Sequence, residues 1–209
     1  TGAVRAEGFT PNVKIWNSLV AMNGDGEVLS TYDKHQLVPF GEFVPLRHVL
    51  PLDKITPGDL DFTRGSGART LAVGNLPPFS PLVCYEGIFP RMATDENHRP
   101  AWMLNVTNDA WYGDCQGPYQ HFDMVRMRAI EQGLPMVRAA NSGISAVMDS
   151  YGRVVERMAL HTHGFFDSPL PTAIAPPPYA RNGELTVLCL TIALFLFFSK
   201  LASRLNKYK

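Results

Sequence analysis

Apolar-rich runs separated by turn-forming residues indicate strands over much of the chain. Two such runs flank residues 23–26, whose sequence is Asn-Gly-Asp-Gly. Glycine supplies the positive φ angles of a tight turn, so residues 13–34 are predicted to form a β-hairpin. Short buried strands are expected at residues 82–84 and 101–109, and residues 53–70, rich in glycine and charge, are expected to be a long surface loop.

Helical spacing of apolar residues is found in the second half of the chain. Residues 119–133 are predicted to be helical, with Gly133 as the C-cap and an apolar side formed by Phe122, Val125, Met127 and Ile130. A second helix is expected near residues 91–97, two strands around 141–143, and a hairpin at 149–153. Strands mixed with helices and hairpins indicate an α/β or α+β layered domain.

The C-terminal part has a different composition. A proline-rich connector, predicted to lack regular helix, leads through residues 176–184 to the almost entirely apolar residues 185–199. A spanning helix needs about 20 mostly apolar residues, so this run is slightly short and a buried core helix is the alternative. We favour a membrane helix because the run has no polar face and little chain follows to cover it.

Basic residues follow the apolar run, namely Lys200, Arg204, Lys207 and Lys209. Basic flanks tend to stay in the cytoplasm. Residues 200–209 are therefore expected to be a cytoplasmic tail, and the domain formed by residues 1–175 is expected on the other side, which in a bacterium is the periplasm.

Composition excludes some classes of function. Lys and Arg number 19, as do Asp and Glu, so the formal net charge is zero and the basic footprint of a nucleic-acid-binding protein is missing. The three cysteines, Cys84, Cys115 and Cys189, form no CxxC pair and no Cys/His metal spacing. We expect no zinc site, no disulfide framework and no cofactor.

Cys84 is the first candidate for chemistry, in the stretch LVCYEGIFP. Buried free cysteines are usually inert, but this one is placed where a strand should end, and Glu86 follows two residues later. A free thiol has a pKa of about 8.5, and a carboxylate alone disfavours the thiolate, so a nucleophilic role requires a cation nearby.

Cations are present in the stretch YDKHQLVPFGEFVPL, in Lys34 and His35, and Glu42 lies between two phenylalanines in the same loop. The alternative interpretations are a solvated turn residue for Lys34 and a surface charge for Glu42, but a lysine just beyond a strand, followed by this loop, is a specific arrangement that apolar packing does not require. Trp111 belongs to an aromatic-rich segment that follows a predicted strand, which suits either core packing or the wall of an apolar substrate site.

These stretches, together with VCYEGIFP, TNDAWYGDCQGPYQHF and PPPYARNG before the apolar run, resemble the apolipoprotein N-acyltransferase family. It is the membrane member of the nitrilase (carbon–nitrogen hydrolase) superfamily. The resemblance covers nearly the whole chain. It implies a nitrilase-like αββα sandwich, incomplete at the N-terminus, on the periplasmic side of the bacterial inner membrane, plus a C-terminal transmembrane helix.

The resemblance also implies roles for residues. Lys34 matches the catalytic lysine and Cys84 the nucleophile, in a Glu–Lys–Cys set. The remaining matches are supporting residues, Tyr85, Glu86 and Glu42, and a residue near the substrate pocket, Trp111.

The implied reaction has two halves. The Cys84 thiolate attacks an ester carbonyl of a phospholipid and forms a thioester, and the amine of a diacylglyceryl-modified lipoprotein cysteine then takes the acyl group. Each half passes through an oxyanion that a Lys34 ammonium could stabilise. Membrane anchoring is consistent with both substrates lying in the bilayer.

In the family, the glutamate that acts as general base precedes the hairpin. This region is absent, and Glu7 is in the wrong place to replace it, so the chain alone is expected to be inactive. The alternatives are a nitrilase-type amidase for small amides, an inactive remnant, and a membrane-tethered binding domain. The C-terminal apolar run argues against a soluble amidase, and a binding domain would tolerate Cys84→Ser.

Overall fold

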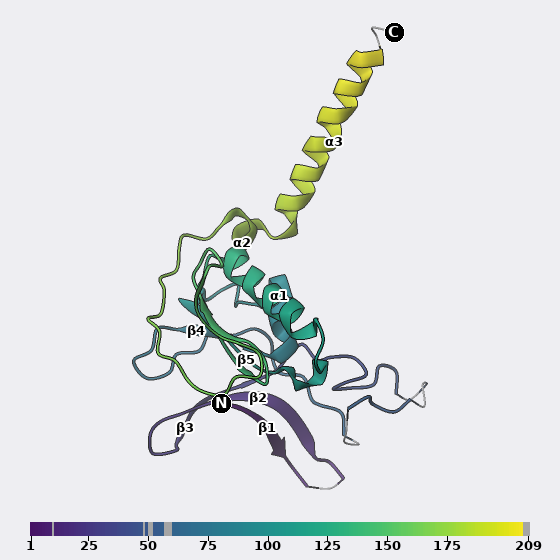
Figure 1. Ribbon diagram of the computed structural model, residues 1–209. Coiled ribbons are helices and arrows are strands. Elements are labelled where there is room, and N and C mark those ends of the chain that lie inside the picture. The colour runs from purple at the N-terminus through teal and green to yellow at the C-terminus, as the bar shows by residue number, and fades with distance from the viewer. Residues whose placement is uncertain (10, 48, 50–51, 57–59, 207–209) are drawn as a thin grey trace.

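The computed structural model describes residues 1–9, 11–47, 49, 52–56 and 60–206. In this part of the chain, two β-sheets and the helix α1 form the body, and a second long helix, α3, projects from it (Figure 1).

The first sheet is antiparallel and has the order β1-β2-β3, with the strands β1 Gly2–Glu7, β2 Lys14–Met22 and β3 Val28–Asp33. Its β2–β3 pair confirms the predicted hairpin. The Asn23 side-chain oxygen accepts hydrogen bonds from the backbone nitrogens of Asp25 at 3.1 Å and Glu27 at 2.8 Å. Such local bonds explain why Asn favours this turn.

The second sheet has the order β4-β5-β6-β7-β8, formed by Phe79–Val83, Trp102–Asn108, Met136–Asn141, Ser145–Met148 and Val154–Met158. Strands β4, β5 and β6 run parallel, so their carboxyl ends meet at one edge, which we call the carboxyl edge. The predicted strands and the second hairpin are confirmed. Cys84, predicted to be in a strand, is instead the first residue of the 3-10 turn Cys84–Ile88.

Helix α1, Gly117–Gln132, confirms the prediction for this segment, and Gly133 caps it with a φ of 61°. Its buried positions follow helical spacing and include Phe122, Val125 and Ala129, which pack on the second sheet. The predicted apolar side was partly wrong, because Met127 and Ile130 are 46% and 39% exposed. Polar residues, His121 and Arg128, occupy buried positions instead.

A second hydrophobic cluster joins the two sheets. Leu19 and Tyr32 come from the first sheet, and Phe79, Val83 and Trp102 come from the second, with the Phe79 and Trp102 ring centroids 4.9 Å apart. The body is therefore layered as helix, sheet and sheet (Figure 1), which confirms the layered α/β class.

The helix predicted near residues 91–97 is wrong. Only Pro90–Met92 forms a 3-10 turn, and bends follow. The Asp95 carboxylate accepts a hydrogen bond from the backbone nitrogen of Asn97 at 2.8 Å. Asp side chains that bond nearby backbone in this way compete with helix formation.

The connector before α3 contains the short helix α2, Pro178–Asn182, although the sequence predicted no regular helix there. Pro178 occupies the first turn, where a missing N–H costs no hydrogen bond. The prediction failed because proline breaks a helix from within and is tolerated at its start.

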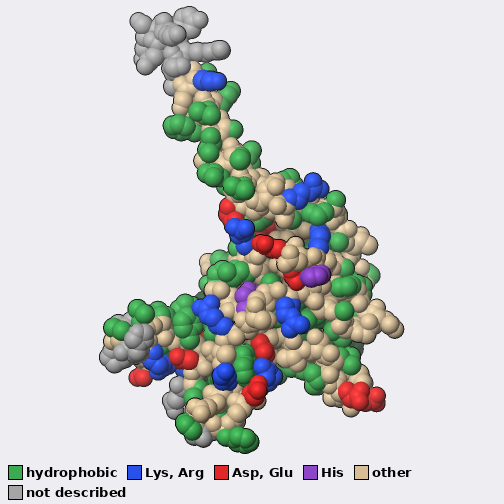
Figure 2. Space-filling view, turned by 180° about the vertical axis from the view of Figure 1, so that it is seen from behind, with side chains coloured by type: hydrophobic (Ala, Val, Ile, Leu, Met, Phe, Trp, Pro, Cys, Tyr) green, Lys and Arg blue, Asp and Glu red, His purple; other side chains and the backbone are tan. Residues whose placement is uncertain are grey.

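Helix α3, Glu184–Asn206, is long and apolar enough to cross a membrane. Within the described part of the chain, no residue of its Glu184–Leu201 window is buried, and hydrophobic side chains lie along this helix (Figure 2), as the membrane-helix prediction expects. Of the predicted basic tail, Lys207, Lys209 and the side chain of Arg204 lie outside the described residues.

Candidate active site

Cys84 directly follows β4 at the carboxyl edge and is half-buried. Its φ of 53° lies in the left-handed region, which non-glycine residues seldom adopt without surrounding constraints. It lines a cavity of about 720 Å³ together with Asn17, Asn108, Trp111 and residues 1–4. Cys84 therefore borders this cavity. A second cavity, of about 620 Å³, lies between β6–β8 and residues 161–170, and Cys84 is not among the residues that line it.

Glu86, predicted to support the nucleophile, is fully buried. Its carboxylate accepts hydrogen bonds from the backbone nitrogens of Val83 at 2.8 Å, His35 at 2.8 Å and Gln36 at 3.1 Å, and from the Tyr32 hydroxyl at 3.0 Å. It thus joins the turn of the nucleophile to the segment that follows Lys34. These hydrogen bonds use both oxygens of the Glu86 carboxylate.

Lys34 and Glu42 form a buried ion pair, with Nζ 2.7 Å from Oε2 and the lysine side chain 1% exposed. Glu42 also accepts hydrogen bonds from the Asn17 amide at 3.0 Å and the Val38 backbone nitrogen at 2.8 Å. Asn17 lines the Cys84 cavity and so links the pair to it, although Lys34 and Glu42 are not among the lining residues. The structure contradicts the interpretation of Lys34 and Glu42 as surface charges.

Trp111 lines the cavity and is 66% exposed, so it is part of a wall rather than of the core. Tyr85 is turned toward α1, where its ring centroid lies 6.2 Å from that of His121. It also lies 5.9 Å from the ring centroid of Phe89, at the end of the Cys84 turn. Of the aromatic candidates, the structure therefore places Trp111, and not Tyr85, on the cavity wall.

Two tyrosines report on the local electrostatics. Burial, followed by the Glu86 carboxylate, raises the pKa of the Tyr32 hydroxyl. Burial raises the pKa of Tyr112 to about 12, with further contributions from the nearby Cys84 and Asp109. Both hydroxyls are therefore protonated donors at neutral pH.

Asn105, Asp109 and Arg138 are buried polar residues near Cys84 that were not proposed as site residues from the sequence. Asn105 and Arg138 interrupt the apolar runs of β5 and β6, and this interruption was the available signal. Asp109 ends the segment predicted as a strand and joins His121 at 3.0 Å. Among the described residues, no three His, Cys, Asp or Glu side chains gather to hold a metal ion.

Comparison of the sequence with known proteins identifies the family of this chain. The carbon–nitrogen hydrolase family model matches residues 2–167. The chain belongs to the carbon–nitrogen hydrolase family. The resemblance to apolipoprotein N-acyltransferases is confirmed by relatives of that name, one from Rhodopseudomonas palustris, 47% identical over 98% of this chain, and one from Rickettsia prowazekii, 37% identical over 88%. The chain covers 39% and 37% of these relatives.

Solved structures of this family confirm the nitrilase-like fold. A double mutant of the amidase from Nesterenkonia sp. AN1 in complex with acrylamide matches with a TM-score of 0.54 and 20% identity, over 88% of this chain and 64% of that one. Nit3 of Saccharomyces cerevisiae matches with a TM-score of 0.53 and 19% identity, over 76% and 55%.

Proposed function

We propose that this chain carries the nucleophile and the lysine of an N-acyltransferase that moves a fatty acyl group from a phospholipid to a diacylglyceryl lipoprotein. The acceptor is the N-terminal amine of the lipid-modified cysteine. The observation that carries the proposal is the placement of Cys84, at the end of a strand and in the wall of a cavity. Relatives at 37–47% identity that are named apolipoprotein N-acyltransferase support it.

In the first half-reaction, the Cys84 thiolate attacks an ester carbonyl of the phospholipid. A C–S bond forms, the C–O bond breaks, and the lysophospholipid leaves as an alcohol after it takes a proton. In the second half-reaction, the lipoprotein amine attacks the thioester, an amide forms, and the thiol of Cys84 is restored. A covalent intermediate divides one difficult transfer into two easier steps.

Lys34 is proposed to stabilise the oxyanion of both half-reactions, because a fixed cation in a dry site lowers the energy of developing negative charge. Its ion pair with Glu42 supports this role, since a buried ammonium needs a partner to stay charged. Glu86 would hold the loop of Lys34 against the turn of Cys84 through its bonds to His35 and Gln36.

The membrane arrangement is part of the proposal. Residues 185–199 would span the bacterial inner membrane after the connector 176–184, with the tail 200–209 in the cytoplasm and the domain 1–175 in the periplasm. The exposed apolar surface of α3 supports a bilayer environment, because exposed hydrocarbon is unfavourable in water. Both proposed substrates are held in the bilayer by their acyl chains, so the cavity beside Cys84 would work next to the bilayer.

The decisive experiment follows acyl transfer to Cys84. The longest reading frame that contains this chain is incubated with a phospholipid of defined acyl chains, and each cysteine peptide is weighed by mass spectrometry. We expect one acyl mass on Cys84 and none on Cys115, and transfer to a diacylglyceryl peptide amine on addition of that acceptor. Cys84→Ser should abolish both events.

Other outcomes would favour the alternatives. Absence of a Cys84 adduct, or equal acylation of Cys115, would contradict the proposal. Release of ammonia from small amides without lipoprotein acylation would favour the amidase, and retained function in Cys84→Ser would favour a binding domain. The inactivity of the 209-residue chain stays a prediction, which the same assay tests against the longer reading frame.

A further inference from the structure

A row of paired residues crosses the sheet beneath Cys84. Leu82 of β4 is paired with Asn105 of β5, and Asn105 is paired with Arg138 of β6. Paired residues of neighbouring strands point to the same face, so the Asn105 and Arg138 side chains lie side by side. Their face is the one that α1 covers, because Arg138 contacts His121 of that helix. Both side chains are buried, at 0% and 1% exposure.

Asn105 contacts the backbone of the nucleophile directly. Its Nδ2 donates to the carbonyl oxygens of Leu82 and Cys84, each at 3.2 Å. Its Oδ1 accepts a hydrogen bond from Nη1 of Arg138. Because a guanidinium can only donate, Arg138 fixes which end of the carboxamide faces it and directs the NH₂ group to the two carbonyls.

Arg138 is itself held in place from two sides. Its Nη2 lies 2.6 Å from Oδ2 of Asp109, and its Nε donates to the carbonyl oxygen of Ile144 at 3.1 Å. Asp109 accepts a further hydrogen bond from the Thr107 hydroxyl at 3.0 Å. The charges of Arg138 and Asp109 compensate each other, so the pair acts on Cys84 through geometry more than through net charge.

The contact between Asn105 and the Cys84 carbonyl lies beside an unusual backbone conformation. A non-glycine residue at a φ of 53° persists where the surrounding structure holds it. The Glu86 carboxylate holds the backbone nitrogen of Val83 on one side of Cys84, and Asn105 holds the Cys84 carbonyl on the other. Gly87 lies against the same carboxamide, since a Cβ there would be 3.4 Å from the Asn105 Nδ2, an ordinary van der Waals contact.

We propose that Asn105 and Arg138 are positioning residues for the nucleophile. Arg138 orients the Asn105 carboxamide, and Asn105 fixes the Cys84 peptide so that the thiol faces the cavity. The inference deepens the proposed function and depends on it only for the identity of the reaction that Cys84 performs.

The test compares the reactivity of two thiols in one protein. Asn105→Asp keeps the size and the oxygen that Arg138 contacts, but it replaces the donor with an oxygen that repels both carbonyls. The rate of iodoacetamide modification at Cys84 is divided by the rate at the exposed Cys115, with peptides quantified by mass spectrometry. We expect this ratio to fall about tenfold or more, since small displacements of a reacting group have large effects on rate.

Ser80→Ala is the matched control. Ser80 is buried on β4, four residues before Cys84, and its hydroxyl donates to the carbonyl oxygen of Ala93 at 2.7 Å. The Ser80→Ala substitution removes a buried hydrogen bond of β4 but leaves the contacts of the Cys84 peptide intact. The ratio of Cys84 to Cys115 modification should therefore stay within about twofold of the wild type. Arg138→Lys, which has one compact donor group in place of the planar fork, should lower the ratio as Asn105→Asp does.

Each result either supports or contradicts the positioning role of Asn105 and Arg138. An unchanged ratio in Asn105→Asp, or an equal fall in Ser80→Ala, would overturn the proposal. If Asn105→Asp fails to fold by circular dichroism, Asn105→Ser is measured in its place and judged by the same ratio. A fall in the ratio without acylation of the wild-type protein by phospholipid would keep the positioning role and overturn the acyl-transfer proposal alone.

Discussion

The Oε1 atom of Glu86 lies 2.8 Å from the backbone nitrogen of His35, although the two residues are 51 positions apart. One residue before His35 is the candidate lysine, and two residues before Glu86 is the candidate nucleophile. This single buried carboxylate therefore joins the two segments on which the proposed chemistry depends. Its loss should affect both stability and activity.

Glu86→Gln keeps the side-chain volume, but its NH₂ group would face backbone N–H groups and the Tyr32 hydroxyl, which now donate to the carboxylate. We expect the free energy of unfolding in urea to fall by about 2–3 kcal/mol, because hydrogen bonds to a buried charged group are lost. Acylation of Cys84 should fall with it. Glu96→Gln is the control, since the Glu96 side chain is 79% exposed and 3.9 Å from Arg91. Equal stability of the two variants would show that Glu86 is not an anchor.

Lys34→Met removes the proposed oxyanion partner and should slow acylation of Cys84 by about 100-fold or more. The same change leaves Glu42 buried without its cation, which destabilises the fold. The double variant Lys34→Met with Glu42→Gln avoids the unpaired charge and separates the two effects. If the folded double variant acylates Cys84 at the wild-type rate, Lys34 has no catalytic role.

Asp109 should make stability depend on pH. Burial alone would raise the pKa of its carboxyl, but the hydrogen bond to His121 and the charge of Arg138 outweigh this and lower it. A pKa below the unfolded value of about 3.9 contributes stability that is present above that pH and is lost as pH falls through the folded pKa. The stability difference between wild type and Asp109→Asn should therefore shrink below about pH 4.

Urea unfolding across pH 2 to 7 measures this difference. At neutral pH, Asp109→Asn should cost about 3–5 kcal/mol, because it leaves Arg138 as an unpaired buried charge. Asp25→Asn, in the exposed hairpin turn, should leave the pH dependence of the wild type unchanged. A constant difference between wild type and Asp109→Asn at every pH would contradict the prediction.

Gly87→Ala tests the close approach of the Cys84 turn to α1. A Cβ at Gly87 would lie 2.7 Å from Cγ2 of Val125, so either the turn or the helix must shift. We expect a loss of about 1–3 kcal/mol in stability, partly restored by adding Val125→Ala. Gly24→Ala is the control, because nothing lies within 4 Å of a Cβ there. Equal melting temperatures for both single variants would rule out the close packing.

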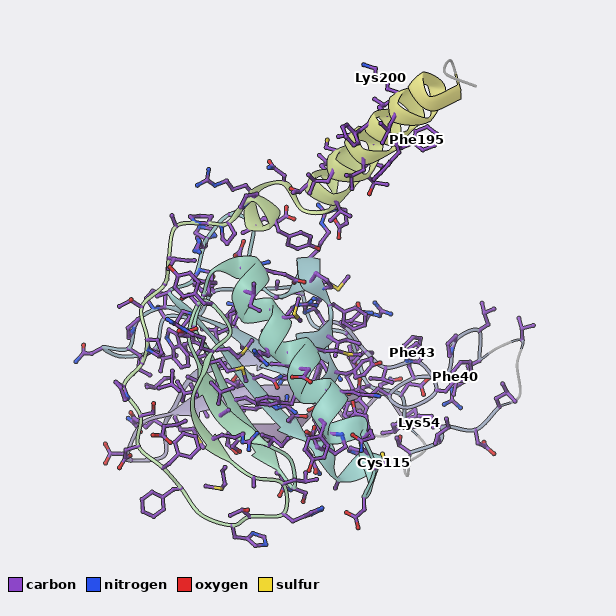
Figure 3. The ribbon with its side chains drawn as sticks, turned by 45° about the horizontal axis from the view of Figure 1, so that its top comes forward. Phe40, Phe43, Lys54, Cys115, Phe195 and Lys200 are labelled. Carbon is purple, nitrogen blue, oxygen red and sulfur yellow. The ribbon has the colours of Figure 1, made fainter. Side chains whose placement is uncertain are left out.

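Native cysteines test the membrane arrangement. Cys189 lies within α3, and Cys115 lies just before α1, at the opposite end of the molecule from Phe195 and Lys200 (Figure 3). In lipid vesicles open to reagent on both faces, a water-soluble maleimide should label Cys115 and spare Cys189, because a thiol in hydrocarbon does not ionise. Labelling of both after denaturation is the control, and equal labelling in vesicles would exclude a spanning α3.

Local sequence was sufficient for several elements. The Asn-Gly-Asp-Gly turn predicted the β2–β3 hairpin, because its bonds join residues within four positions of each other. Helical spacing and Gly133 predicted α1, and the apolar run predicted α3, since a helix closes its own hydrogen bonds. Cys84, Lys34 and Glu42 became candidates through neighbouring residues and a family resemblance.

Long-range pairing determined the rest. Asn105 and Arg138 are 33 positions apart and meet only because β5 and β6 are paired in that register. Glu86 binds His35 across 51 positions, so its neighbours in sequence gave no sign of its partners. The Cys84 carbonyl, beside the positive φ of that residue, is likewise bonded by Asn105 of β5, 21 positions away. Turns and helices depend on short-range bonds that a sequence reveals, whereas this site depends on contacts that exist only once the sheet has formed.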